Sequence, residues 1–161
     1  MNEATIQDIK FMRMAIALSK QNVEQALGGP FGAVIVKEGK IISKTANKVA
    51  ATNDPTAHAE VAAIRLASKK LNSFDLSGCV IYTSCEPCPM CLGAIYWSRI
   101  DRIYYANTKH DAAAIGFDDK FIYDELDLDV DKRQLPVTQL LREEAMEAFK
   151  KWKVTELKVE Y

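Results

Sequence analysis

The stretch Thr83–Gly93 reads T-S-C-E-P-C-P-M-C-L-G and holds three of the four cysteines in the chain. Cys88 and Cys91 are three residues apart, so on a helix they lie on one face, one turn apart. Pro87 and Pro89 predict that this helix begins here, because a missing N–H costs little in the first turn. A helix N-terminus also stabilises the thiolate form that binds metal ions. The stretch therefore predicts two metal ligands at the start of a helix.

A second stretch upstream, Ala57-His58-Ala59-Glu60, supplies a third ligand. Zinc prefers nitrogen and sulfur ligands in a tetrahedron, and three protein ligands leave the fourth position for water, whose pKa falls to about 7. We therefore predict that His58, Cys88 and Cys91 bind one zinc ion per subunit. Glu60 is the predicted catalytic residue, because a carboxylate two residues from His58 could take a proton from that water and return it to a leaving amine.

Cys85 leaves a second kind of zinc site open. It lies three residues before Cys88, so a closed structural site with four protein ligands is conceivable. Its members would be His58, Cys85, Cys88 and Cys91. A closed site has no use for an acid beside the histidine, and this favours the open, catalytic interpretation.

Length and composition narrow the class of protein. With 161 residues, the chain is expected to form a single domain, 1–161, with a hydrophobic core. No apolar run has membrane-spanning length, and Lys10 and Arg13 interrupt the apolar residues near the N-terminus, so neither a membrane segment nor a signal peptide is expected. The clustered cysteines indicate metal binding in the reducing cytoplasm rather than disulfides. The net charge of −1 disfavours a nucleic-acid partner, because RNA-binding surfaces are strongly basic.

The predicted elements run helix, hairpin, helix, strand, helix, strand, and then a C-terminal helix. The predicted helices cover residues 6–27, 57–70, 89–98 and 137–152, and the predicted strands cover residues 31–37, 41–46, 79–83 and 102–106. In the first helix, the expected apolar positions are Ile9, Met12, Ile16 and Val23. Asp54 or Thr56 is the expected cap of the second helix. Alternation of strand and helix predicts parallel pairing of the last two strands.

Three further expectations concern particular positions. In the helix over 89–98, the core candidates are Leu92, Ile95 and Tyr96. The run D-E-L-D-L-D-V-D at 124–131 is expected to be a solvated acidic loop. Residues 153–161 alternate apolar and polar side chains and are expected to form an extended C-terminal arm.

The pairing of H-x-E with P-C-x-x-C is the signature of the zinc nucleobase deaminases. Here it lies within the longer strings N-D-P-T-A-H-A-E at 53–60 and E-P-C-P-M-C-L-G-A at 86–94. On these strings the chain resembles the cytidine deaminase superfamily. That resemblance implies an α/β fold, namely a three-layer α/β/α sandwich with a mixed sheet. It also implies a metal at the N-termini of two helices on one face of the sheet.

The stretch Gly116-Phe117-Asp118-Asp119 bears on the substrate. Guanine presents N–H donors at N1 and at the 2-amino group, which a carboxylate accepts, whereas adenine has no N1–H. The aspartates could instead cap a short helix or face water. The strings G-G-P-F-G-A-V-I-V at 28–36 and G-F-D-D with F-I-Y resemble bacterial guanine deaminases. This implies zinc-dependent hydrolysis of guanine, a small purine base, to xanthine and ammonia in purine catabolism or salvage.

The same resemblance implies roles for four residues of the body of the chain. Asn47 would contact the purine, and Phe31 would pack near it. Ala59 would offer a backbone group beside the zinc, and Asp119 would recognise the base and serve in a second proton transfer. From the residues alone, Asn47 could equally be a turn residue that bonds its own backbone, and Phe31 a core residue.

The resemblance also implies a homodimer whose C-terminal segments, about 137–161, are exchanged between subunits. Tyr161 would then come from the partner and help to close each pocket, unless the terminus is frayed. Other functions stay open: a tRNA adenosine deaminase, which shares the strings at 53–60 and 86–94, a deaminase of guanosine, cytosine or aminotriazines, and a non-enzymatic zinc-stabilised module. The G-F-D-D segment, the tail and the weak basic character favour guanine over tRNA.

Overall fold

The computed structural model describes residues 4–161, so residues 1–3 of the predicted 1–161 domain lie outside the described part. The chain divides into two units, which lie within Met1–Asp119 and Lys120–Tyr161. The first unit contains the sheet and helices α1 to α5, and the second contains α6, a 3-10 turn and α7. None of the helices in residues 4–161 has the length and apolar character that crossing a bilayer would require.

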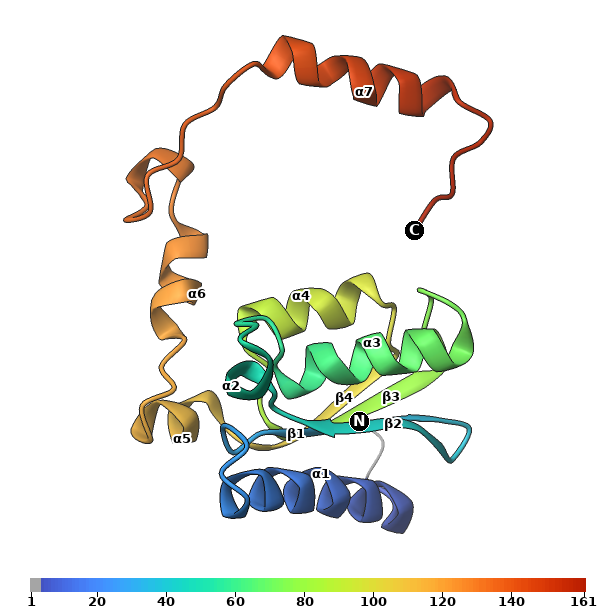
Figure 1. Ribbon diagram of the computed structural model, residues 1–161, viewed down its shortest axis with the longest axis vertical. Helices are drawn as coiled ribbons and strands as arrows, with labels where there is room; N and C mark the ends of the chain where they lie inside the picture. The colour runs from blue at the N-terminus through green and yellow to red at the C-terminus, as the bar shows by residue number, and fades with distance from the viewer. Residues whose placement is uncertain (1–3) are drawn as a thin grey trace. The chain divides into compact units, whose positions relative to one another are not determined.

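A mixed four-stranded sheet forms the centre of the first unit (Figure 1). Its strands, in the spatial order β2-β1-β3-β4, are β1 (Gly32–Lys37), β2 (Lys40–Ala46), β3 (Cys79–Cys85) and β4 (Arg102–Asn107). β1 pairs antiparallel with both β2 and β3, whereas β3 and β4 are parallel. The predicted hairpin and the predicted parallel pair are therefore confirmed.

Helices cover both faces of this sheet, as Figure 1 shows. α1 (Ile6–Glu24) packs on one face, and α3 (Ala59–Leu71) and α4 (Pro89–Trp97) lie on the other. Successive strand residues point to opposite faces, so Val34 and Tyr82 join the core under α1, while Ile35 and Ile81 join the core under α3. This is the predicted α/β/α sandwich with a mixed sheet. The short helices α2 (Val49–Thr52) and α5 (Lys109–Ala114) follow β2 and β4.

The buried face of α1 differs from the predicted one. Its buried residues are Phe11, Ala15, Ser19 and Asn22, whereas Ile9 and Val23 are exposed. Met12 packs against the core as predicted. The apolar pattern missed Ser19 and Asn22 because these buried positions are polar and have hydrogen-bond partners. The Ser19 hydroxyl donates to a carbonyl of its own helix, and the Asn22 amide donates to carbonyls outside it.

The ends of the helices also differ from the prediction. α1 ends at Glu24 rather than at residue 27, because Ala26 adopts a positive φ of 51°. α3 begins at Ala59, with His58 at the N-cap position and no side-chain capping bond. The two residues predicted to cap it bond to each other instead, since Asp54 Oδ1 accepts hydrogen bonds from the N–H and hydroxyl of Thr56 at 2.8 and 2.6 Å. In α4, Ile95 is buried as predicted, but Tyr96 is 77% exposed.

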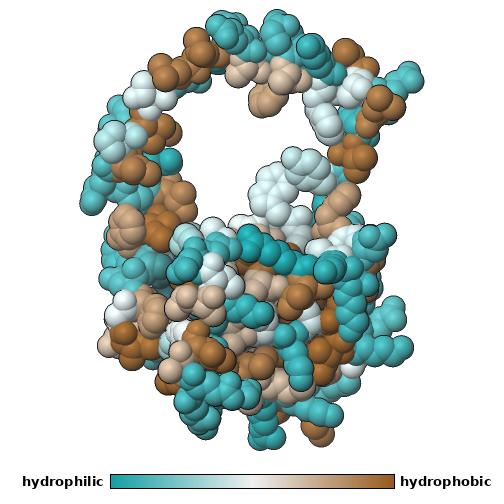
Figure 2. All heavy atoms as spheres, viewed as in Figure 1, coloured by the Kyte–Doolittle hydropathy of each residue, from teal (hydrophilic) through white to brown (hydrophobic). Residues whose placement is uncertain are grey.

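The second unit consists of α6 (Lys120–Asp127), the 3-10 helix η1 (Val130–Lys132), α7 (Arg142–Val154) and a tail that ends at Tyr161. The run at 124–131 is thus partly helical rather than a loop. α7 starts five residues later than predicted because Leu141 has a positive φ of 53°. No residue of Lys120–Tyr161 is buried. Figure 2 shows apolar side chains, in brown, on the surface of this unit.

Candidate active site

Two helix N-termini on the same face of the sheet bring the predicted metal ligands together. His58 is the N-cap residue of α3, Cys88 is the N-cap residue of α4, and Cys91 lies in the first turn of α4. Pro89 occupies the start of α4, as the sequence predicted. The ligand atoms of the three residues lie within 4.8 Å of one another. His58 Nδ1 is 3.6 Å from Cys88 Sγ and 3.5 Å from Cys91 Sγ.

These distances fit a tetrahedral zinc ion. Typical bond lengths of about 2.0 Å to nitrogen and 2.3 Å to sulfur place the two ligand atoms about 3.5 Å apart. One imidazole nitrogen and two thiolate sulfurs are also a donor set that zinc prefers over harder cations. The three residues therefore form a site of the right size and chemistry for zinc, with no fourth protein ligand among residues 4–161.

Cys85 does not join the ligand group. Its thiol donates a hydrogen bond to the carbonyl oxygen of Thr108, with sulfur and oxygen 3.6 Å apart. Burial also raises the pKa of the Cys85 thiol to about 11. The geometry thus favours the open three-ligand site over the closed four-ligand alternative.

The three ligand side chains are hydrogen-bonded to one another, and these bonds shift their pKa values. The bond to Cys91 is the main cause that lowers the pKa of Cys88 to about 4. The same bond, together with burial, raises the pKa of Cys91. The pKa of His58 is raised above 6.5, mainly by its bond to Cys88. Thiolate and neutral imidazole are the forms that bind zinc, so metal binding by these three side chains would release protons.

Glu60 lies beside this group at the second position of α3. It is only 6% exposed, and the thiol of Cys91 donates a hydrogen bond to its Oε2 at 3.5 Å. Burial raises the pKa of the Glu60 carboxyl. A buried carboxyl that adjoins the ligands without belonging to their group stands where the sequence predicted a proton carrier.

Asp119 is the aspartate of the G-F-D-D stretch that the family resemblance assigns to base recognition. It is half-buried, whereas Asp118 is exposed. Burial and then the charge of Cys88 raise the pKa of Asp119. The pKa of His58, raised first by its bond to Cys88, is raised also by the charge of Asp119. Asp119 is therefore within electrostatic reach of the predicted metal site.

Asn47 follows β2 and is buried. Its Oδ1 accepts a hydrogen bond from the N–H of Val49 at 3.2 Å, so the turn interaction considered from the sequence is present. Because only the amide oxygen can accept this bond, it fixes the orientation of the side chain. The Nδ2 group remains as a donor without a protein partner in residues 4–161. The N–H of Lys48 donates to the carbonyl of Ala57 at 2.9 Å, which ties this segment to the residue before His58.

The other predicted base-binding residues are spread over both units. The ring of Phe31 packs edge-on against Phe117, with centroids 4.9 Å apart and planes at 89°, and it also packs against the core under α3. Ala59 is fully buried at the first position of α3, where helices leave N–H groups without intrahelical partners. Tyr161 ends the second unit and is exposed, so its place in a pocket stays a prediction.

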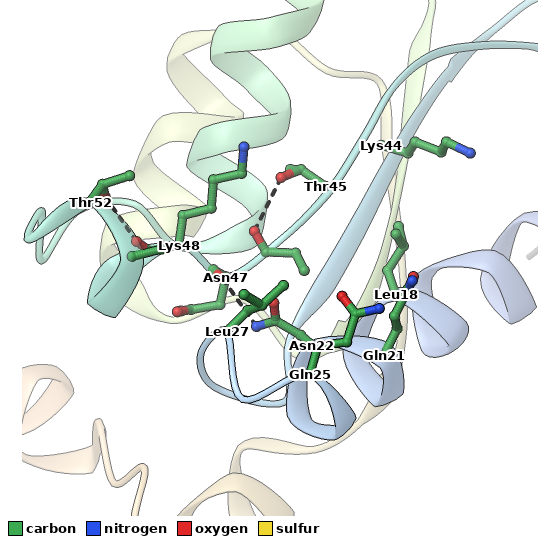
Figure 3. Close-up of a pocket in the computed structure, with 12 residues that line it drawn as sticks. Leu18, Gln21, Asn22, Gln25, Leu27, Lys44, Thr45, Asn47, Lys48 and Thr52 are labelled. Carbon is green, nitrogen blue, oxygen red and sulfur yellow. Dashed lines mark hydrogen bonds between the residues drawn. The ribbon is translucent and has the colours of Figure 1, made fainter.

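A cavity of about 490 Å³ lies between α1, the end of β2 and α2 (Figure 3). Asn47 lines it, but none of the three predicted metal ligands does. Asn22 of α1 also lines it and donates a hydrogen bond to Asn47. Sequence reasoning missed Asn22. The signal available was its spacing of seven residues from Ala15, which continues one helix face.

Comparison with known proteins agrees with this geometry. Residues 5–107 match the zinc-binding region of the cytidine and deoxycytidylate deaminases. The guanine deaminase of Bacillus subtilis is 50% identical over 151 residues, which are 94% of this chain and 97% of that protein. The X-ray structure of the Bacillus subtilis guanine deaminase matches with a TM-score of 0.92 and 48% identity, over 100% of this chain and 99% of the other.

Two further relatives match over a smaller part of the chain. The tRNA-specific adenosine deaminase of Aquifex aeolicus is 45% identical over 96 residues, which are 60% of this chain and 63% of that protein. A guanine deaminase structure from Nitrosomonas europaea matches with a TM-score of 0.66 and 34% identity, over 74% of this chain and 68% of the other. The chain therefore belongs to the cytidine and deoxycytidylate deaminase zinc-binding family and, within it, to the guanine deaminases.

Proposed function

We propose that this chain hydrolyses guanine to xanthine and ammonia with one zinc ion per subunit. The observation that carries the proposal is the likeness to Bacillus subtilis guanine deaminase over 94% of the chain, at 50% identity. The likeness to a tRNA-specific adenosine deaminase covers only 60% of the chain. The site adds the chemistry, because three zinc-type ligands adjoin a buried carboxyl.

In the proposed reaction, Glu60 moves the protons. Its carboxylate takes a proton from water as the water oxygen bonds to C2 of guanine, and it returns a proton to the 2-amino nitrogen, which leaves as ammonia. A zinc ion held by His58, Cys88 and Cys91 lowers the pKa of water toward 7 and so supplies a nucleophile at neutral pH. The burial of Glu60 supports this role, because desolvation moves a carboxyl pKa toward the range in which it can both accept and donate.

Asn47, Asp119, Phe31 and Ala59 form the proposed base-binding set. The Nδ2 donor of Asn47 suits an acceptor atom on the purine, and the Asp119 carboxylate suits the N1–H and 2-amino donors of guanine. Asp119 would also take part in a second proton transfer. Adenine lacks the N1–H, so it would leave the Asp119 carboxylate without that donor. Phe31 would pack on the ring, and Ala59 would offer its backbone beside the metal.

A comparison of substrates tests this proposal. Zinc-loaded protein is incubated separately with guanine, guanosine, cytosine, an aminotriazine and tRNA, and ammonia release is measured together with the deaminated product. We expect guanine to have the highest kcat/KM. Turnover of adenosine in tRNA with none of guanine would replace the proposal with a tRNA deaminase. Equal turnover of guanosine would extend the substrate class to nucleosides.

We further propose that the working form is a cytoplasmic homodimer in which the segments of about 137–161 are exchanged, so that Tyr161 completes the partner's pocket. The C-terminal unit supports this, because none of its residues is buried and Phe149 on α7 is 70% exposed. Aromatic side chains of α4, Tyr96 and Trp97, are also exposed in the single chain. All four cysteines are free thiols, the state that the reducing cytoplasm maintains.

Mixing two inactive variants tests the exchange. One variant is Glu60→Gln, and the other lacks Tyr161. In a mixed dimer with exchanged segments, one site combines an intact Glu60 with an intact Tyr161 from the partner. Half the dimers in an equal mixture are mixed, so we expect about a quarter of the wild-type activity to return after subunit exchange. Without exchange, no site is complete and activity stays at the level of the parents.

A further inference from the structure

Asn22 belongs to a closed ring of hydrogen bonds with two of the proposed base-binding residues. It lies in the last turn of α1 and is 5% exposed. Its Nδ2 donates to the carbonyl oxygens of Gly29, at 2.8 Å, and Asn47, at 3.1 Å. The N–H of Phe31 donates to the same Gly29 oxygen at 2.8 Å, and the N–H of Asn47 donates to the Phe31 oxygen at 2.9 Å. One amide group on α1 thus holds both Phe31 and Asn47 through the backbone.

The chemistry of an asparagine matches this position. The two hydrogens on Nδ2 serve the two carbonyl acceptors, which also fixes which way the amide points. Figure 3 shows Asn22 reaching from α1 toward Asn47, which comes from the segment after β2. Within residues 4–161, Asn22 is the only hydrogen-bond partner of the Asn47 carbonyl. Loss of the Asn22 amide would therefore release a buried backbone group directly attached to the proposed recognition side chain.

Close packing makes the ring intolerant of small shifts. A Cβ added at Gly28 would lie 3.0 Å from the carbonyl oxygen of Asn47, 3.1 Å from Nδ2 of Asn22 and 3.2 Å from Oδ1 of Asn47. A Cβ added at Gly29 would lie 3.1 Å from the ring of Phe31 and 3.3 Å from that of Phe117. Groups this tightly packed transmit a displacement rather than absorb it.

We propose that Asn22 is a positioning residue for guanine recognition. Through its hydrogen bonds to the backbone, Asn22 sets the placement of the Asn47 amide and the Phe31 ring. The inference rests on the proposed function and adds to it a residue on α1 that is neither a metal ligand nor a base contact. Recognition by an amide donor depends on its placement to a fraction of an ångström. Loss of Asn22 should therefore weaken substrate binding more than it slows the chemical step.

Steady-state kinetics of Asn22→Ala and Asn22→Asp test the proposal, since aspartate keeps the shape but has no hydrogens to donate. The matched control is Gln21→Ala, which changes the exposed neighbour of Asn22 on the same turn. We expect KM for guanine to rise about tenfold in both Asn22 variants, with kcat changed less than about threefold and zinc content unchanged. We expect the control to match the wild type. An unchanged KM in folded, zinc-loaded Asn22 variants would overturn the proposal.

A double-mutant cycle separates positioning from a general loss of stability. If Asn22 acts through Asn47, Asn22→Ala should add little to the KM of Asn47→Ala, whereas independent effects would multiply and contradict the proposal. Gly28→Ala is a second variant that keeps every hydrogen-bonding group and displaces the ring by contact, and it should also raise KM. Should the Asn22 variants fail to fold, an unchanged KM in Gly28→Ala would itself overturn the proposal. Wild-type protein that does not deaminate guanine would contradict the proposed function, and this inference with it.

Discussion

The two units of the chain differ in what they bury. Residues 4–119 enclose two clusters of buried side chains, one on each face of the sheet. The helices that begin after His58 and Cys88 contribute buried residues to the cluster under α3. In Lys120–Tyr161, by contrast, two helices expose their apolar side chains and no residue is buried. Most helical stability in proteins comes from packing of an apolar face. The first unit therefore has the buried side chains that support the metal site, whereas the second unit has an apolar surface that the proposed dimer would cover.

The largest expected effect falls at the centre of the first unit. Glu60→Gln removes the proton carrier while keeping size and burial, so we expect guanine turnover to fall about 10²–10⁴-fold. Zinc content and the unfolding midpoint should stay close to those of the wild type. Ammonia release and metal analysis on the same sample measure both quantities. The exposed Glu24→Gln on α1 is the control. Turnover retained in Glu60→Gln would remove the catalytic role from this carboxyl.

The next effect separates a ligand from a neighbouring cysteine. Cys91→Ala removes a sulfur of the ligand group, and we expect zinc affinity to fall by more than about 100-fold. Cys85→Ala should retain one zinc ion per chain, because the Cys85 thiol bonds the Thr108 carbonyl instead. Competition with a chromogenic chelator measures both affinities. Zinc lost from Cys85→Ala but kept by Cys91→Ala would reverse the assignment and favour a closed site.

Substitution of one apolar residue in each unit tests whether the two units differ in what their apolar side chains do. Ile81 is fully buried in the sheet, so Ile81→Ala should lower the free energy of unfolding by about 2–5 kcal/mol. Phe149 is exposed on α7 in the single chain, and we expect Phe149→Ala to weaken the proposed dimer about tenfold or more. Urea unfolding measures the first effect and sedimentation velocity the second. A dimer as tight as the wild type in Phe149→Ala would argue against a partner for this face.

The smallest expected effect lies where α1 meets the sheet. Hydrogen bonds from Thr5, and then from the hydroxyl of Tyr82 on β3, hold the pKa of Asp8 below its usual 3.8. A lowered pKa in the folded state stabilises the protein above the unfolded-state value, and this contribution is lost as the pH falls through the folded-state value. Because Asp8 is partly solvated, Asp8→Asn should cost less than about 1 kcal/mol at neutral pH.

Urea unfolding of Asp8→Asn and wild type at several pH values tests this prediction. The difference in unfolding free energy should be present at neutral pH and shrink as the pH falls below 3.8. Guanine turnover at pH 7 should not change, because Asp8 touches neither the ligands nor the proposed base-binding residues. A difference that is independent of pH would show that Asp8 does not act through its charge.

The sequence predicted that His58, Cys88 and Cys91 come together, because chemistry limits the types of metal ligand and helix geometry limits their spacing. Cys88 and Cys91 share the first turn of α4, and His58 precedes Glu60 at the start of α3, so a short pattern carries most of the site. The strands could also be predicted from the sequence, because each is a short run of residues that favour strands. The hairpin and the parallel pair were predicted, whereas the antiparallel pairing of β1 with β3, which completes the order of the sheet, was not.

What the sequence could not predict depends on contacts distant along the chain. Asn22 is polar and yet buried because it bonds the carbonyl of Asn47, 25 residues away, and no local pattern shows such a partner. Tyr96 fits the helical spacing of a core residue but is exposed in the single chain. Periodicity reports that a face is apolar, and it does not distinguish burial within a chain from burial between chains.

Zinc-edge X-ray absorption on the zinc-loaded protein tests the central claim most directly, because it counts the sulfur atoms bound to the metal. An open site formed by His58, Cys88 and Cys91 predicts two sulfurs at about 2.3 Å, with nitrogen or oxygen at about 2.0 Å completing the shell. Three sulfurs would place Cys85 on the metal, close the site and contradict the assignment of the chain's chemistry to this centre.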